Sequence, residues 1–239
     1  MSTIATFRVK RPRPTKLSDP FRDFSGDTLA KLLATPDDKL DASQYRNLLG
    51  FLPAGTYEEV IYFLPGAFRY FIANEEAAFD IPAEIIRYVS INKIYLDDDG
   101  ILETVRDCLR ECLDRCTKEF VVIHKARAVS QTSYIDDVKH SDFIAEFTFE
   151  LVSCETHADL IEQFVRGLSD NNNDPVKSAW FLEYSARLYS PAVDPEPVRS
   201  LVKDQERLNM AADIVRHHSE FIDTAPTYWR DTFKLLNIE

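Results

Sequence analysis

The chain has 239 residues, 45% of them hydrophobic and 28% charged, which is the composition of a folded protein with a substantial core. Its formal net charge of −12 disfavours nucleic acid as a partner, and its six glycines are few for a fold built on glycine-rich phosphate loops. It contains no apolar run of the ~18 residues that a membrane span needs, and no apolar signal segment at its N-terminus. Its four cysteines lack disulfide-like spacing, so we expect a cytoplasmic protein with reduced thiols and no membrane partner.

Basic residues are concentrated at the N-terminus. Residues 1–22 hold six basic side chains and one acidic one, which leaves a net charge of −17 on the remainder. We interpret residues 1–22 as a basic arm that is partly flexible, as chain termini commonly are. Arg8, Arg11 and Arg13 are its candidate partner-binding residues, and their target could be a phosphate, an acidic protein surface or the body of this protein. Nucleic acid is expected only through this arm, whereas the acidic remainder should attract a basic protein partner.

The next signals along the chain are typical of helix starts. Asp41 or Ser43 is a candidate N-cap, and Thr56 with Glu59 has the spacing of a capping box directly before an apolar run. A helix should therefore begin at Tyr57. Pro65 has no N–H to continue that helix, so we expect a break or a kink there.

The aromatic stretch, residues 50–71 with the sequence GFLPAGTYEEVIYFLPGAFRYF, has two interpretations. Helices that are apolar on nearly every side are usually buried, so the first interpretation is a central helical hairpin in the core. The second is a partner-binding surface, because tyrosine combines a large apolar ring with a polar tip that tolerates water. Tyr57, Tyr62 and Tyr70 are the candidate binding residues in that case.

Pro82 fits the first turn of a further helix, and residues 101–123 form a clear amphipathic segment. Cys108, Cys112 and Cys116 recur every fourth residue along it. The first and last of them would lie ~12 Å apart on a helix, too far to bind one metal ion together. We therefore interpret them as buried thiols that pack like small apolar residues, and we predict no metal and no cofactor.

A polar segment, residues 125–142, reads as a connection and as a possible seam between two parts. The main interpretation is nevertheless one helical domain from residue 23 to residue 239. Residues 143–152 fit the alternation of a strand and also the spacing of a helix, and we expect a helix because the neighbouring segments are helical.

The C-terminal third contains two Asp-Pro pairs, Asp174–Pro175 and Asp194–Pro195, each typical of a capped helix start. The second pair opens a long periodic segment that ends near residue 222. Together these signals predict a mainly α fold, a compact multi-helix domain with about nine or ten helices and at most one or two short strands.

No nucleophile elbow, P-loop or dinucleotide-binding motif is present, so the sequence leans against an enzyme without excluding one. The acidic body and the aromatic stretch favour an intracellular protein-interaction protein, such as an inhibitor or immunity-type protein that covers a basic partner. The alternative is a metal-dependent or hydrolytic helical enzyme. Its site would use Asp213, His217 and Glu220, which would share one face of a continuous helix.

Overall fold

The computed structural model describes residues 2–74, 81–126, 134–153, 157–170, 173–192 and 194–238, with the backbone alone described at 81–82, 124–126 and 134–137. The chain is mainly helical, as its sequence predicts, but the described residues form more helices than the nine or ten expected. None of these helices combines the length and the apolar character needed to cross a bilayer.

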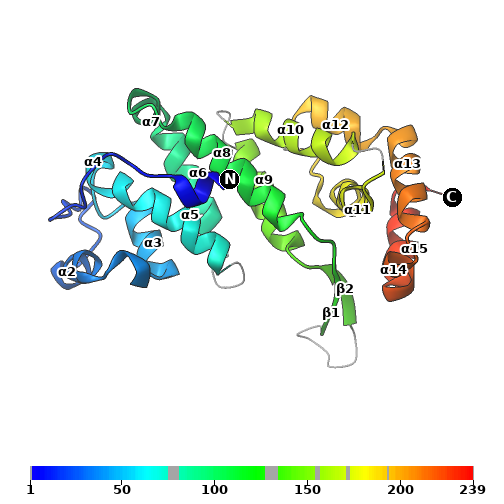
Figure 1. Ribbon diagram of the computed structural model, residues 1–239, viewed down its shortest axis with the longest axis horizontal. Coiled ribbons are helices and arrows are strands. Elements are labelled where there is room, and N and C mark those ends of the chain that lie inside the picture. Colours follow the sequence, from blue (N-terminus) through cyan, green and yellow to red (C-terminus); the bar gives the residue numbers. More distant parts are fainter. Residues whose placement is uncertain are drawn as a thin grey trace. The chain divides into compact units, whose positions relative to one another are not determined.

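The chain divides into two compact units, Met1–Cys112 and Leu113–Glu239 (Figure 1). The division falls inside helix α8 (Leu102–Cys116), upstream of the polar segment 125–142. Along α8 the three cysteines are buried, as is Leu109. Burial raises the pKa of the Cys108 thiol to about 12, so this sulfur stays protonated and packs as an apolar group.

Unit 1 is built around α3, α5 and α6, which contact one another. Its helices before α8 are α1 (Thr3–Thr6), α2 (Gly26–Ala34), α3 (Ala42–Leu49), α4 (Tyr57–Val60), α5 (Leu64–Ala73), α6 (Ile81–Ile91) and α7 (Lys93–Asp98). Two 3₁₀ turns, η1 (Asp37–Lys39) and η2 (Ile61–Phe63), complete it. Leu48, Val60, Leu64 and Ile86 are fully buried in its core.

The expected helix starts in this unit are present. The Asp41 carboxylate accepts the N–H of Gln44 at 2.8 Å and caps α3, and the Glu59 carboxylate accepts the N–H of Thr56 at 3.1 Å ahead of α4. The expected helix break near Pro65 lies slightly earlier than predicted, because α4 ends at Val60 and a 3₁₀ turn follows over Ile61–Phe63. Pro65 then lies in the first turn of α5, where its missing N–H costs nothing.

Unit 2 contains the remaining elements. They are β1 (Val122–Ala126), β2 (Tyr134–Val138), α9 (Ser141–Ser153), α10 (Ala158–Ser169), α11 (Pro175–Glu183), the π-helical turn η4 (Tyr184–Leu188), α12 (Glu196–Val202), α13 (Gln205–Arg216), α14 (Ser219–Thr224) and α15 (Pro226–Leu235). Helix α11 contacts α10 and α13, and α10 also contacts α9 and α12. The ring of Phe120 lies 5.2 Å from Trp180 and 5.4 Å from Trp229, centre to centre, within an aromatic core.

Two of the sequence predictions are wrong, and one open choice is resolved as expected. The helix count was too low because two segments expected to be continuous are interrupted, at Asn92 between α6 and α7 and at Asp204 between α12 and α13. The side chain of Asn92 donates to the carbonyl of Tyr88, and the carboxylate of Asp204 caps the new helix start. Part of the expected polar connection is a strand, since β1 and β2 pair antiparallel. Residues 143–152 are helical, as expected.

Candidate functional site

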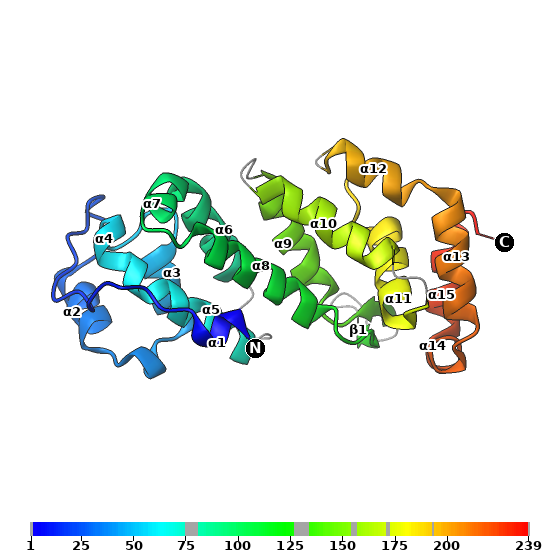
Figure 2. The same ribbon diagram turned by 45° about the horizontal axis from the view of Figure 1, so that its top comes forward.

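The N-terminal arm lies along unit 1, beside α5 (Figures 1 and 2). Ile4 and Phe7 are buried, and the Phe7 ring meets the Phe68 ring edge-on at 6.2 Å between centres. At the start of the arm, the Glu111 carboxylate accepts hydrogen bonds from the Ser2 hydroxyl at 2.6 Å and from the Ile4 N–H at 3.1 Å. The arm therefore packs as part of the unit.

Arg11 of the arm is held by Asp99, with guanidinium-to-carboxylate distances of 2.8 and 2.9 Å from one nitrogen. The same guanidinium lies over the ring of Tyr57, 5.5 Å from its centre, and the Tyr57 hydroxyl donates to Asp99 at 2.8 Å. This hydrogen-bonded guanidinium lowers the pKa of Asp99 below its ordinary value. Arg11 and Tyr57 thus both bond to Asp99 of the same chain.

We expect the Asp99→Asn variant to lose stability in a pH-dependent way. A carboxylate whose folded-state pKa is lowered stabilises the fold above its unfolded pKa of about 3.9, and this contribution disappears as pH falls through the folded-state value. Urea denaturation from about pH 7 down to about pH 3 should therefore show the variant to be less stable at neutral pH, with its difference from the wild type shrinking as pH falls below about 4. Asp98→Asn, which removes the same charge from an exposed neighbour, is the control. A stability difference that does not change with pH would contradict the role assigned to Asp99.

Arg13 of the arm is also engaged inside the protein. Its guanidinium pairs with the Asp37 carboxylate at 3.1 Å, donates to the carbonyl of Thr35, and lies over the ring of Phe63, 5.7 Å from its centre. The Tyr62 hydroxyl donates to the second oxygen of Asp37. One carboxylate therefore holds two of the residues that the sequence singled out.

The remaining predicted binding residues are Tyr70 and Arg8. Tyr70 is half-buried, with its ring 5.4 Å from the ring of Tyr45. Arg8 is exposed and donates to the carbonyls of Ala5 and Phe7. The structure therefore gathers all six predicted residues where the arm meets the aromatic stretch, but gives most of them internal partners.

An exposed apolar groove of unit 1 was not identified from the sequence. It has a volume of about 220 Å³ and is lined chiefly by Phe21, Phe51, Tyr57, Tyr88 and Ile91. We call these side chains the apolar groove. Phe21, Phe51 and Ile91 are 54%, 69% and 65% exposed. Such a gathering of large exposed apolar side chains is typical of a binding surface, whereas single exposed ones are ordinary.

The floor and one wall of the apolar groove are fixed by internal contacts. Tyr57 is buried, and its ring stacks with Tyr88 at 6.4 Å and with Tyr95 at 5.1 Å. In the loop that carries Phe21, the Asp19 carboxylate accepts the N–H groups of Asp23 at 3.0 Å and Phe24 at 3.1 Å. The groove is therefore largely formed before any partner binds.

Two acidic residues, Glu58 and Glu84, adjoin residues that line the apolar groove. Glu58 is exposed next to Tyr57, and a Glu84 oxygen lies 3.4 Å from the position that a Cβ on Gly50 would take. The cations Arg22 and Lys93 are adjacent in the chain to lining residues, and Arg11 lies over the ring of Tyr57, while the chain as a whole carries a net charge of −12. The net charge of the chain therefore favours a positively charged partner.

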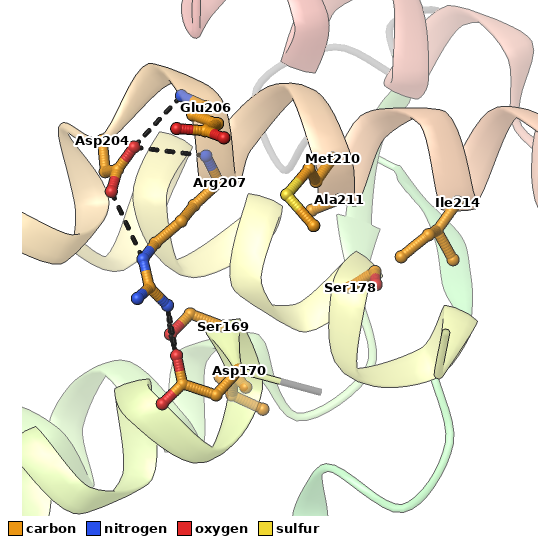
Figure 3. Close-up of a pocket in the computed structure, with 10 residues that line it drawn as sticks. Ser169, Asp170, Ser178, Asp204, Glu206, Arg207, Met210, Ala211 and Ile214 are labelled. Atoms are coloured by element: carbon orange, nitrogen blue, oxygen red, sulfur yellow. Dashed lines mark hydrogen bonds and ion pairs between the residues drawn. The ribbon is translucent and has the colours of Figure 1, made fainter. Parts of the chain in front are cut away.

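A larger cavity, of about 520 Å³, lies within unit 2 among α10, α11 and α13 (Figure 3). Arg207 dominates its polar side and pairs with Asp170 and with Asp204, the latter at 3.3 Å. The paired guanidinium lowers the pKa of Asp170, and Asp204 also accepts the N–H of Glu206 at 3.1 Å. Arg207 thus joins Asp170 to Asp204, and Asp204 also caps α13, so we assign this cavity a structural role.

The alternative enzymatic site gains no support from the geometry. Helix α13 ends at Arg216, so Asp213 and Glu220 lie on different helices. The His217 ring nitrogen Nδ1 lies 2.6 Å from the carbonyl oxygen of Asp213 and bonds the backbone there. Among the residues with described side chains, no group of three or more His, Cys, Asp or Glu residues is placed to hold a metal ion.

Sequence reasoning found the aromatic stretch but missed Phe21 and Ile91. Ile91 continues the apolar pattern of α6, and only its position at the very end of that helix signals that its side chain leaves the core. Phe21 follows a proline in the arm and has no periodicity. Comparison with known proteins adds no further guide to the site, because no family model, curated protein or solved structure matches the chain.

Proposed function

We propose that the chain is a protein-interaction protein and that unit 1 binds a basic, amphipathic segment of another protein. The observation that carries this proposal is the apolar groove, in which three large apolar side chains are more than half exposed around a preformed floor. Apolar side chains of the segment would enter the groove, and its basic residues would lie near the exposed Glu58 and be attracted by the net negative charge of the chain. An inhibitor that covers a basic protein would use such a surface.

A second copy of this chain fits the groove less well. Two copies would bring together chains that each carry a net charge of −12. Like charges across an interface oppose association, whereas opposite charges accelerate it at low salt. The net charge of the chain therefore favours a basic partner over self-association.

The test is selection of random displayed peptides of about 16 residues, long enough for an amphipathic helix, on the full-length protein. We expect the enriched peptides to carry net positive charge and apolar residues three and four positions apart, and to bind more weakly at high salt. Phe51→Asp should abolish their binding, because it places a charge in the middle of the apolar contact.

Phe149→Asp is the matched control, because Phe149 is 51% exposed on α9 in unit 2 and does not line the apolar groove. It should leave peptide binding unchanged. Selected peptides that are acidic, or that bind wild type and Phe51→Asp equally, would refute the proposal. Concentration-dependent dimerisation that Phe51→Asp abolishes would identify a second copy as the occupant instead.

A further inference from the structure

A second cavity of unit 1, of about 300 Å³, lies between the N-terminal arm and α5. Its polar lining consists of Arg8, Asp37, Tyr45, Tyr62 and Arg69, and we call it the arginine pocket. Ligand pockets commonly occupy ~300–1,000 Å³, so this volume suits a small molecule.

The arginine pocket holds positive charge that its own carboxylate does not balance. Neither Arg8 nor Arg69 forms an ion pair with a carboxylate in the part of the chain that the structure describes, although Arg69 donates weakly to the Phe7 carbonyl at 3.4 Å. Asp37 is the one acidic residue among the described lining residues. Both of its oxygens are already bonded, one by Arg13 and one by the Tyr62 hydroxyl.

The two guanidinium groups are close enough to repel each other. The pKa of Arg69 is lowered, first by burial of its side chain and then by the positive charge of Arg8. An anion placed between the two groups would remove this repulsion, and the planar guanidinium can present two parallel N–H groups to a carboxylate or phosphate.

The hydroxyl of Tyr45 supplies a third donor. Tyr45 is 3% exposed, and among the described residues its hydroxyl has no hydrogen-bond partner. The hydroxyl lies against Gly66, where a Cβ would come within 2.7 Å of its oxygen. Both residues line the cavity, so the absence of a side chain at Gly66 leaves room for this hydroxyl there. Burial raises the pKa of Tyr45 to about 12, so the hydroxyl keeps its proton at neutral pH and can donate it in a hydrogen bond.

We propose that the arginine pocket binds a small molecule through an oxyanion, a phosphate or carboxylate group held by the guanidinium groups of Arg8 and Arg69 and the hydroxyl of Tyr45. This site lies apart from the apolar groove in its lining residues and stands whether or not the groove binds a protein. The basic arm thus supplies one cation, and the aromatic stretch supplies the other, Arg69.

The test is calorimetric titration of the full-length protein with inorganic phosphate and, separately, with succinate, in a chloride buffer of constant ionic strength. We expect saturable binding of one molecule per chain, weakened about tenfold or more by Arg8→Gln and by Arg69→Gln. Arg69→Lys should give an intermediate affinity, since it keeps the charge and loses the planar fork. Tyr45→Phe, which removes a single oxygen, should also weaken binding.

Lys10→Gln is the matched control, because it removes the same charge from an exposed residue of the arm that does not line the arginine pocket. Binding of phosphate alone or succinate alone would assign the oxyanion class. Absence of saturable binding of both ligands would overturn the proposal. So would equal weakening by Lys10→Gln and Arg69→Gln, because diffuse attraction to the basic arm would then explain the result.

Discussion

Replacing Glu183 by alanine is expected to lower the free energy of unfolding by about 3 kcal/mol or more, because it leaves a partly buried arginine without its counter-ion. Glu183 is 1% exposed and sits where α11 passes into the π-helical turn η4. Its carboxylate accepts hydrogen bonds from the Ser141 hydroxyl at 2.8 Å, from the Arg187 guanidinium at 2.8 Å and from the Tyr228 hydroxyl at 2.5 Å. Three donors from α9, η4 and α15 thus converge on one buried acid.

The same guanidinium donates to the Thr232 hydroxyl at 2.8 Å and lies over the ring of Tyr228, 4.3 Å from its centre. Truncating Glu183 therefore disturbs every member of the network, and each buried donor that loses its acceptor costs a further ~1–3 kcal/mol at most. Urea denaturation followed by tryptophan fluorescence should report the loss, since Trp180 and Trp229 lie in this unit.

Glu162→Ala is the matched control for that experiment. Glu162 also pairs with an arginine four residues later, Arg166 at 2.9 Å, but its side chain is 32% exposed. Exposed helical pairs of this spacing contribute only about 0.3–0.5 kcal/mol. Equal effects of the two substitutions would show that Glu183 is solvated and would remove the basis for its structural role.

Replacing Phe7 by alanine is expected to lower the free energy of unfolding by about 3–5 kcal/mol, the usual cost of deleting a buried phenylalanine ring. Phe7 is 3% exposed and meets Phe68 of α5. This substitution distinguishes an arm that packs on unit 1 from a mobile tail, because a mobile tail would not contribute to the free energy of unfolding. The result also tests a condition of the arginine pocket, because Arg8 follows Phe7 directly and the buried Phe7 ring holds this part of the arm in place.

Phe21→Ala provides the comparison within the same part of the chain. Phe21 is 54% exposed, and exposed substitutions usually change stability by no more than about 0.5 kcal/mol. Chemical denaturation of both variants should therefore show a large shift for Phe7 and almost none for Phe21. A wild-type midpoint in Phe7→Ala would mean that the arm does not pack on unit 1 in solution.

Local signals predicted much of the fold correctly. The capping residues Asp41 and Asp174, and the proline at position 82, mark helix starts that the structure contains, because these effects depend on neighbours within one turn. The helix count failed where a single side chain ends a helix inside an apolar pattern, as at Asn92. Whether the side chain of such a residue bonds its own backbone is decided by packing, which periodicity does not encode.

The candidate sites depend even more on tertiary contacts, which local sequence patterns do not encode. The aromatic stretch stood out in the sequence, yet its tyrosines differ, since Tyr57 is buried while Tyr62 and Tyr70 are half-buried. The arm arginines were chosen for their charge, but their partners Asp99 and Asp37 lie 88 and 24 positions away from Arg11 and Arg13. Contacts between such distant residues come from the tertiary fold, so the sequence alone could not tell an engaged arginine from a free one.

The most direct test of the proposed interaction is photo-crosslinking in the native cell, with a benzophenone amino acid in place of Phe51 and, as the control, in place of Phe149. We expect crosslinks at Phe51 to join protein segments that are basic and amphipathic, Ile91→Asp to suppress them, and Phe149 to give none of them. Crosslinks at Phe51 to acidic segments, to lipid or to a second copy of this chain would contradict this expectation, as would the same products at both positions.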